Sequence, residues 1–339
     1  MAKSSITIND IARELNVAPS TVSRALNNSR KISDATKKKI VDKAEQLGYN
    51  LNMIAASLSR RATNTIGVVI PAINNHFYSQ VVNGIEELAS NKGYRILIAQ
   101  TRDSVAKEKE IMRTLSATRV DGVIACLSLE TKNTDHLHNL TKNEIPLILF
   151  DRVNYDFPCQ KVITDNYSAM TQSVSHLARS GNKNLAHMGG PLGCNIYTEH
   201  ARAFKDALKK NNLPLQPQFH LSSDLTEEDI TEAMKIWFSQ ELKPDAIITA
   251  NSSAALLVSK LAKELNISIP KDLAIVSLTS EPALRFVEPQ ITSIELPGIE
   301  MGRTSMEFLL EKITNRDQNF NTTIKPFQLI IRNSSFHNQ

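Results

Sequence analysis

Cysteine, long apolar runs and leader-like segments are scarce or missing in this chain of 339 residues. Its three cysteines, Cys126, Cys159 and Cys194, stand far apart in or beside apolar segments, a pattern typical of buried, reduced thiols in a cytosolic protein. The longest apolar runs, such as GVVIPAI and IPLILF, are far shorter than the roughly 18 residues that a membrane span requires. The opening MAKSSITINDIARE has no apolar core, so we expect no secretory signal.

Signatures of catalysis and metal binding are also missing. The sequence has no Gly-x-Ser-x-Gly elbow and no Cys/His cluster, and His136 and His138 stand two apart, which disfavours chelation from one helix face. The GGPLG run at 189–193 falls short of the dinucleotide fingerprint. We therefore expect no enzyme activity, no catalytic residue, no metal and no cofactor.

Positive charge is concentrated at the start of the chain. Residues 1–62 contain 11 Lys and Arg against 5 Asp and Glu, a net charge of +6. The remaining residues contain 28 Lys and Arg against 30 Asp and Glu, a net charge of −2. A basic head on a near-neutral body is the electrostatic pattern expected of a protein that contacts a phosphate backbone.

The residue pattern of the basic head predicts three short helices. Thr7 and Ser33 are expected N-caps of the first and third helices, and Gly48 is the expected stop of the third. Between them, Ala18, Val22, Ala25 and Leu26 fall on one apolar stripe of a second helix. This order matches a helix-turn-helix, and the charge weighs against the alternative of a chance amphipathic bundle.

From Thr65 onward, short β-branched runs alternate with amphipathic stretches. The expected strands are TIGVVIP, YRILIAQ, DGVIACL, PLILFDR, KVITD, NLAHMGG, DAIITAN, LAIVSLT and ITSIEL. Helical patterns lie near 78–92, 105–117, 166–180, 197–211, 227–240, 252–265 and 299–314. Strand–helix alternation with continuously apolar strands predicts α/β lobes with parallel sheets covered on both faces, and the strands suffice for two lobes.

Several runs carry a resemblance to a known family. The head TINDIARELNVAPSTVSRALNNSRKISDATKKKIVDKAEQLGYN, and downstream runs including TNTIGVVIPAINNHFYSQVVNGIEELASNKGY and LPGIEMGRTSMEFLLEKI, resemble the lac repressor/galactose repressor family over nearly the whole chain. The resemblance implies an all-α helix-turn-helix head joined to a periplasmic-binding-protein-like, two-lobed α/β effector domain. It also implies a transcriptional regulator, and more specifically a repressor.

The same resemblance implies the domain boundaries. The helix-turn-helix head spans 1–50, a hinge helix spans 51–63, and an effector-binding and dimerisation domain spans 64–339. Within that domain, the N-lobe contains about 64–164 and 293–324, and the C-lobe contains about 165–292 and 325–339. The chain is expected to cross between the lobes near Thr164, Thr292 and Lys325.

Contacts with double-stranded DNA are assigned to three sets of residues. Base edges are expected to meet Pro19, Ser20, Thr21 and Arg24, of which Arg24 suits guanine O6 and N7. Phosphates are expected to meet Thr7, Ser23, Asn27 and Ser33. The resemblance implies that Ile54, Ala55, Leu58 and Ser59 meet the minor groove at the centre of a palindromic operator, with Leu58 as a wedge. Alternatively, Leu58 is a linker residue that packs against the body. Leu51 replaces the family's usual proline, which raises the cost of ordering the hinge.

A small ligand is expected between the lobes, at residues carried over from the family. These are Phe77, Tyr78, Asp151, Arg152, Ile196, His200, Leu225, Asn251 and Thr279. The match is mixed, because His200 replaces a common arginine and Thr279 lies in a Ser-Leu-Thr-Ser run that replaces an acidic one. The expected effector is a neutral, sugar-like molecule, and loss of effector control is the alternative.

The combined prediction is a cytoplasmic, nucleoid-associated homodimer without a membrane partner. The C-terminal IIRNSSFHNQ carries no heptad helix, which favours a dimer over a tetramer. Two other functions stay open. One is a DNA-binding regulator without small-molecule control, and the other is a sugar-binding transport protein, against which the basic head argues.

Overall fold

The computed structural model describes residues 6–26, 29–49, 63–315 and 319–336. The chain divides into two compact units, Met1–Thr63 and Asn64–Gln339, which we describe separately. Several residues with predicted roles lie outside the described part of the chain, namely Asn27, Leu51, Ile54, Ala55, Leu58 and Ser59.

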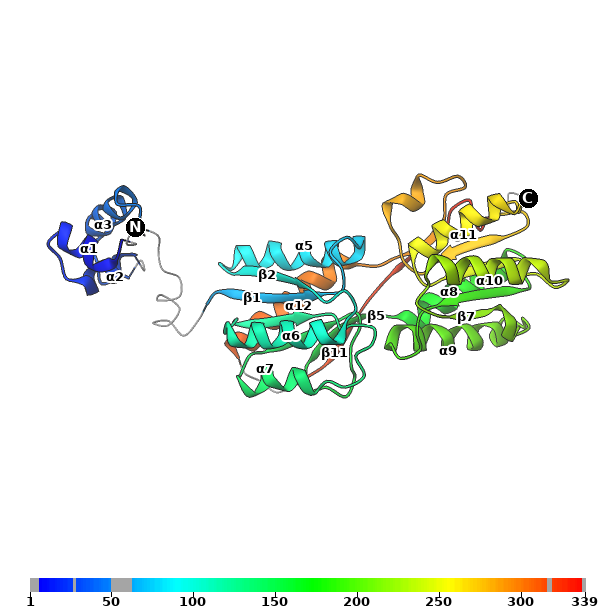
Figure 1. Cartoon of the computed structure of the whole chain (residues 1–339), viewed down its shortest axis with the longest axis horizontal. Helices are drawn as coiled ribbons and strands as arrows, with labels where there is room; N and C mark the ends of the chain where they lie inside the picture. The colour runs from blue at the N-terminus through cyan, green and yellow to red at the C-terminus, as the bar shows by residue number, and fades with distance from the viewer. Residues whose placement is uncertain (1–5, 27–28, 50–62, 316–318, 337–339) are drawn as a thin grey trace. The chain divides into compact units, whose positions relative to one another are not determined.

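The head contains three helices, α1 (Ile8–Glu14), α2 (Pro19–Leu26) and α3 (Asp34–Gln46), as predicted (Figure 1). The backbone nitrogen and the hydroxyl of Thr7 both donate to Asp10 Oδ2, at 2.9 and 2.7 Å, which closes the start of α1. Ser33 Oγ accepts from the Thr36 backbone nitrogen at 3.4 Å, and Gly48, at φ +66°, ends the third helix. The predicted caps and stop are therefore confirmed.

The core of the head is small and apolar. Ile11, Val22 and Ile40 are fully buried, one from each helix, with an alanine from each helix beside them. Ala18 was expected on this apolar stripe, but it is exposed because it precedes the first turn of α2.

The body contains two six-stranded sheets. The first sheet, in the order β11-β5-β4-β3-β1-β2, consists of β1 (Thr65–Ile70), β2 (Arg95–Gln100), β3 (Gly122–Ala125), β4 (Leu147–Phe150), β5 (Gln160–Thr164) and β11 (Thr322–Lys325). The second, in the order β12-β10-β9-β8-β6-β7, consists of β6 (Leu185–Gly189), β7 (His220–Ser222), β8 (Ala246–Thr249), β9 (Ala274–Ser277), β10 (Thr292–Glu295) and β12 (Gln328–Ile330). All pairings are parallel except that of β10 with β12.

Helices cover both faces of each sheet. The first lobe carries α5 (His76–Asn91), α6 (Val105–Ala117), η1 (Asp135–Leu137), α7 (His138–Lys142) and α12 (Gly298–Thr314). The second lobe carries α8 (Asn166–Arg179), α9 (Asn195–Lys210), η2 (Pro217–Phe219), α10 (Glu227–Ser239), α11 (Ser252–Glu264) and η3 (Pro282–Arg285). Successive strand residues face opposite layers: Val68 belongs to the core under α5 and α12, and Val69 belongs to the core under α6. The predicted two-lobed α/β fold is confirmed.

The structure corrects the expected strand list and one crossing. The short strands β7, β11 and β12 and the five-residue α7 were not predicted. The second crossing between the sheets follows Glu295 rather than Thr292, because β10 still pairs with β9 in the second sheet. The first crossing follows Thr164 and the third follows Lys325, as expected (Figure 1).

Helices α5 and α12 pack unusually closely through glycine. A Cβ at Gly302 would lie 2.0 Å from the carbonyl oxygen of Val81, and a Cβ at Gly84 would lie 2.1 Å from that of Ile299. Both obstacles are backbone atoms, so neither can move aside alone. The two helices therefore approach each other at a distance that only glycine permits.

Gly302→Ala is expected to lower the free energy of unfolding of the body by about 1–3 kcal/mol, because overpacking forces the two backbones apart. Urea denaturation of the full chain measures this loss. The exposed Ser90→Ala on α5 is the matched control and should stay within about 0.5 kcal/mol of the parent. Equal stability of Gly302→Ala and the parent would contradict the close approach.

Candidate functional site

The second helix of the head presents a polar face to solvent. Pro19, Ser20 and Arg24 are exposed, while Thr21 and Ser23 are half-buried at the edge of this face. The opposite side of α2 is fixed in the core by Val22 and Ala25. The structure therefore brings the predicted base-reading residues together on one helix.

The Arg24 side chain is not engaged with another described residue. The ion pairs described in the head are Arg13–Asp10, Lys37–Asp34 and Lys43–Glu14, with N–O distances of 3.7, 3.1 and 3.0 Å. The cations outside these pairs, within the described head, are Arg24, Arg30, Lys31, Lys38 and Lys39. They leave unneutralised positive charge on the head, as contact with phosphate requires.

Two predicted phosphate contacts have competing partners. The Thr7 hydroxyl already donates to Asp10, and the Ser33 hydroxyl lies 2.8 Å from that of Thr36. Both side chains are exposed, but their first role in this structure is to cap α1 and α3. A phosphate would have to share or replace these hydrogen bonds.

In the body, the predicted ligand residues of the first lobe follow the carboxyl ends of strands. Tyr78, near the start of α5, donates its hydroxyl to Asp151 Oδ2 at 3.1 Å, and Asp151 follows β4. Both side chains are buried, and burial raises the pKa of the Asp151 carboxyl. Asp151 also has a left-handed backbone, φ 59°, which aspartate tolerates better than most residues.

Arg152 is neutralised by a residue that sequence reasoning missed. Its guanidinium lies 2.5 Å from Asp103 Oδ1 and 6.0 Å from the centre of the Tyr78 ring. Asp103 stands in the turn before α6, far from Arg152 in sequence, and no motif marks it. The first-lobe side of the site therefore holds one ion pair, Arg152–Asp103, and one carboxylate hydrogen-bonded to a phenol. The Phe77 ring lies beside them, with its centre 5.3 Å from that of the Tyr78 ring.

The predicted residues of the second lobe are held mainly by one another and by helix ends. Asn251 caps α11 by accepting from the Ala254 nitrogen at 2.8 Å. Thr279 accepts from the Ser252 nitrogen and receives the Ser252 hydroxyl at its carbonyl, both at 3.0 Å. Ile196 and Leu225 are half-buried, at the start of α9 and just before α10.

His200 is buried and neutral. It is 3% exposed, and burial lowers its pKa to about 3. Its Nδ1 has no hydrogen-bond partner among the described residues, and neither ring nitrogen of the fully buried His187 has one. The rings of His187 and His220 are tilted at 44° to each other with centres 5.1 Å apart, so imidazoles from β6, α9 and β7 share one region of the second lobe.

Contacts between the lobes show that the carboxyl ends of the two sheets meet. The Val153 nitrogen, after β4, donates to Asn195 Oδ1 at the start of α9 with a length of 3.2 Å. Burial raises the pKa of Tyr197 and the nearby Arg152 opposes that rise, which places a first-lobe cation close to a second-lobe phenol. Ligands of open α/β sheets bind at such carboxyl ends.

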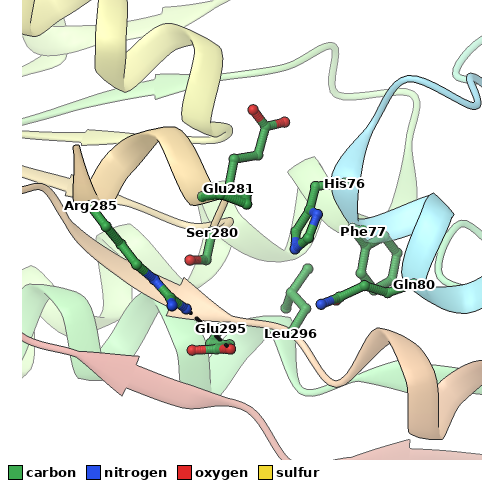
Figure 2. Close-up of a pocket in the computed structure, with 9 residues that line it drawn as sticks. His76, Phe77, Gln80, Ser280, Glu281, Arg285, Glu295 and Leu296 are labelled. Carbon is green, nitrogen blue, oxygen red and sulfur yellow. Dashed lines mark ion pairs between the residues drawn. The ribbon is translucent and has the colours of Figure 1, made fainter. Parts of the chain in front are cut away.

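A hollow of about 270 Å³ lies beside this region (Figure 2). It is lined by residues from α5, from the loop and η3 after β9, and from the crossing after β10. Phe77 is the predicted ligand residue that it contains, and its other walls were not predicted because no sequence motif marks them.

Membrane-spanning helices and clusters of metal-binding side chains are both missing from the part of the chain that the structure describes. No described helix combines the length and apolar character needed to cross a membrane. The same residues hold no group of three or more His, Cys, Asp or Glu side chains placed to bind a metal ion.

A basic helix-turn-helix head and a two-lobed body of mostly parallel α/β sheets define the class of a DNA-binding regulator. Residues 7–52 match the bacterial regulatory proteins of the lacI family, and residues 63–333 match the periplasmic binding proteins and sugar-binding domain of the same family. The chain belongs to the lacI family of bacterial regulatory proteins.

Similar proteins span the whole length. Catabolite control protein A of Priestia megaterium is 31% identical over 92% of this chain and 93% of that protein. The HTH-type transcriptional regulator RegA of Clostridium acetobutylicum is 32% identical over 97% of this chain and 98% of that protein. Both relatives carry the names of regulatory proteins.

Solved structures share the fold. A lac repressor dimer bound to operator and the anti-inducer ONPF superimposes with a TM-score of 0.87 at 21% identity, covering 98% of this chain and 100% of that one. A complex of the transcriptional regulator CelR with cellobiose gives a TM-score of 0.72 at 23% identity, covering 97% and 99%.

The buried histidines predict a specific acid sensitivity. The pKa of His200 is lower in the folded chain than in the unfolded chain, where it is about 6.5, so below pH 6.5 the unfolded state binds more protons. His200 therefore contributes stability above pH 6.5 that is lost as the pH falls toward about 3. His200→Leu should gain about 2 kcal/mol relative to the parent on going from pH 7 to pH 5.

Urea denaturation at half-unit steps between pH 5 and pH 7.5 measures this difference. His138→Gln, at an exposed position on α7, is the control and should follow the parent. If His200→Leu and the parent lose stability in parallel, the imidazole is not held neutral by burial.

Proposed function

We propose that this chain binds a palindromic operator as a homodimer and represses transcription, with an operator affinity that a small uncharged ligand between the lobes changes. The observation that carries the proposal is the exposed polar face of α2 on a capped, apolar three-helix core. In this proposal α2 lies in the major groove, where Arg24 contacts a guanine and Pro19, Ser20 and Thr21 contact neighbouring base edges.

The remaining predicted DNA contacts belong to the same proposal. Ser23 and the cap residues Thr7 and Ser33 would contact phosphates that set the register, together with Asn27. The segment with Ile54, Ala55, Leu58 and Ser59 would contact the minor groove at the operator centre. The similarity to a lac repressor dimer bound to operator supports this arrangement.

An exposed sheet edge supports the homodimer. Strand β2 lies at the edge of the first sheet, and its Leu97 and Ile98 are 45% and 38% exposed. An uncovered apolar edge strand invites pairing, and proteins usually cover or charge such an edge. A second copy of the chain would cover it and would match the two halves of a palindrome.

The charged groups at the site between the lobes already have partners or are neutral, which supports an uncharged ligand. Arg152 is neutralised by Asp103, Tyr78 donates to Asp151, and His200 is uncharged near neutral pH. A ligand with hydroxyl groups can hydrogen-bond to such a site, whereas a phosphate or carboxylate would meet no free cation among these groups. The cellobiose complex of CelR agrees with a sugar-like effector.

A regulator without small-molecule control is the second candidate. It is favoured by the hydrogen bonds that Thr279 and Ser252 make to each other and by the burial of His200, which leave few polar groups free for a ligand. In both candidates the chain acts as a non-enzymatic regulator at cytoplasmic, nucleoid-associated DNA.

Selection of bound sequences from random duplex DNA at moderate ionic strength tests the proposal. The parent chain should enrich a palindrome with two equal half-sites. Arg24→Ala should lose preference at one base pair of each half-site and bind the selected site more weakly by about 1–3 kcal/mol per contact.

Arg13→Ala, an exposed cation on α1, is the matched control and should keep the base preference. Uniform weakening of Arg24→Ala on every sequence would assign Arg24 to phosphate instead. The absence of any enriched palindrome with the parent chain would refute the proposed function.

Thermal unfolding with neutral sugars and with sugar phosphates separates the two candidates. A neutral sugar at about 100 times its dissociation constant should stabilise the parent by about 2.7 kcal/mol, and Asp151→Asn should weaken this effect. Sugar phosphates should give no comparable shift. A flat response to every sugar tested would favour the regulator without small-molecule control.

A further inference from the structure

The hollow beside the crossing at Glu295 has walls from both lobes (Figure 2). His76, Phe77 and Gln80 come from the start of α5 in the first lobe. Arg285 comes from η3 in the second lobe, and Glu295 ends β10 where the chain crosses over. Its volume of about 270 Å³ is slightly below the roughly 300–1,000 Å³ of drug-sized ligand sites, so it suits a small molecule.

Polar groups around the hollow have unused hydrogen-bonding capacity. Within the described residues, the side chains of His76 and Gln80 make no hydrogen bond. Arg285 and Glu295 form an ion pair with an N–O distance of 3.8 Å, which is too long for a hydrogen bond. Figure 2 shows the Gln80 amide and the His76 ring directed toward the space between them and this ion pair.

The arrangement of charge restricts the ligand. Of the charged groups in the lining, Arg285 and Glu295 stand 3.8 Å apart and Glu281 adds a second carboxylate, so a ligand with only one charge would be repelled by the charge of its own sign. An α-amino acid carries a carboxylate and an ammonium joined through one carbon, and it can meet both protein charges at once. Arg285 offers a carboxylate a planar pair of donors, and Gln80 offers an amide donor.

Apolar side chains complete the walls. Phe77 and Leu296 face the hollow from α5 and from the crossing. They would contact an apolar side chain while the charged end of the ligand meets the ion pair. We infer that this hollow binds an α-amino acid with an apolar side chain, with its carboxylate at Arg285 and Gln80 and its ammonium at Glu295.

This site differs from the one proposed for the uncharged ligand. It shares Phe77 with that set but contains neither Asp151 nor Arg152 nor His200. Because its walls come from both lobes and from a crossing, a bound amino acid would favour one angle between the lobes. The inference does not depend on the proposed DNA sequence preference.

Calorimetric titration of the full chain with L-leucine tests the inference. One L-leucine per chain should bind, with a dissociation constant below about 1 mM. Two probes, 4-methylpentanoate and 3-methylbutylamine, keep the apolar part but lack the ammonium or the carboxylate, respectively, and each should bind at least tenfold more weakly.

Variants locate the binding. Arg285→Gln and Glu295→Gln should each weaken L-leucine binding at least tenfold. Lys260→Gln removes a cation from a surface pair of equal length, Lys260–Glu264 at 3.8 Å, and should bind like the parent. All three variants should keep the melting temperature of the parent chain without ligand.

Three results would overturn the inference. One is no measurable binding of L-leucine to the parent, and another is equal binding of 4-methylpentanoate, which would indicate a simple carboxylate site. The third is parent-like binding of L-leucine by both Arg285→Gln and Glu295→Gln, which would place L-leucine outside this hollow. Selection of an operator by the parent chain is independent of all three, so failure here is distinguishable from failure of the proposed function.

Discussion

Three crossings of the chain between two sheets constrain the rest of the body. After Thr164, Glu295 and Lys325 the backbone leaves the sheet in which it has just paired and continues into the other lobe. A change in the angle between the lobes must therefore be absorbed in these short segments, as in hinge motions generally. Because the carboxyl ends of both sheets meet beside the crossings, any ligand there touches the parts that must move.

Because α12 packs against α5, the chain is fixed to the first lobe directly after the second crossing. This helix begins at Gly298, directly after the crossing, and approaches α5 so closely that Gly84 and Gly302 admit no side chain. Glu295 is the last residue of β10, and Leu296 directly after it packs against the core under α5 and α12. A hollow at this point is built from well-fixed backbone, although its charged side chains are half-exposed.

Much of this fold could be predicted from local sequence. Central strands such as β1 and β3 are buried on both faces and stand out as continuous apolar runs. Thr7 and Ser33 mark helix starts by their own hydrogen bonds. The short strands β7, β11 and β12 escaped prediction because HLS, TTIK and QLI become strands only through distant partners. The position of the second crossing could not be predicted either, because it depends on the pairing of β10 with β9.

The candidate site was predictable as a set of positions but not as a set of interactions. Tyr78, Asp151 and Thr279 do follow strand ends, yet their partners are decided by tertiary contacts. Asp103 lies 49 residues before the arginine that it neutralises, and Ser252 lies 27 residues before Thr279. The hollow at Arg285 and Glu295 has no motif at all, since its residues come together only when both lobes have folded.

The chemistry of α2 also bears on why the proposed regulator would need two copies. Its face offers a single arginine among short hydroxyls and a proline, so one head supplies about one strong base contact, with a discrimination of about 1–3 kcal/mol. Specific regulators bind their sites about 4–10 kcal/mol more tightly than bulk DNA. Two heads on a palindrome double the free energy of discrimination that base contacts supply. In this proposal, bending of the operator centre supplies the rest of the preference over bulk DNA. In the proposed function, a head with so few base contacts would depend on pairing for its specificity, and the exposed edge at β2 offers a surface for that pairing.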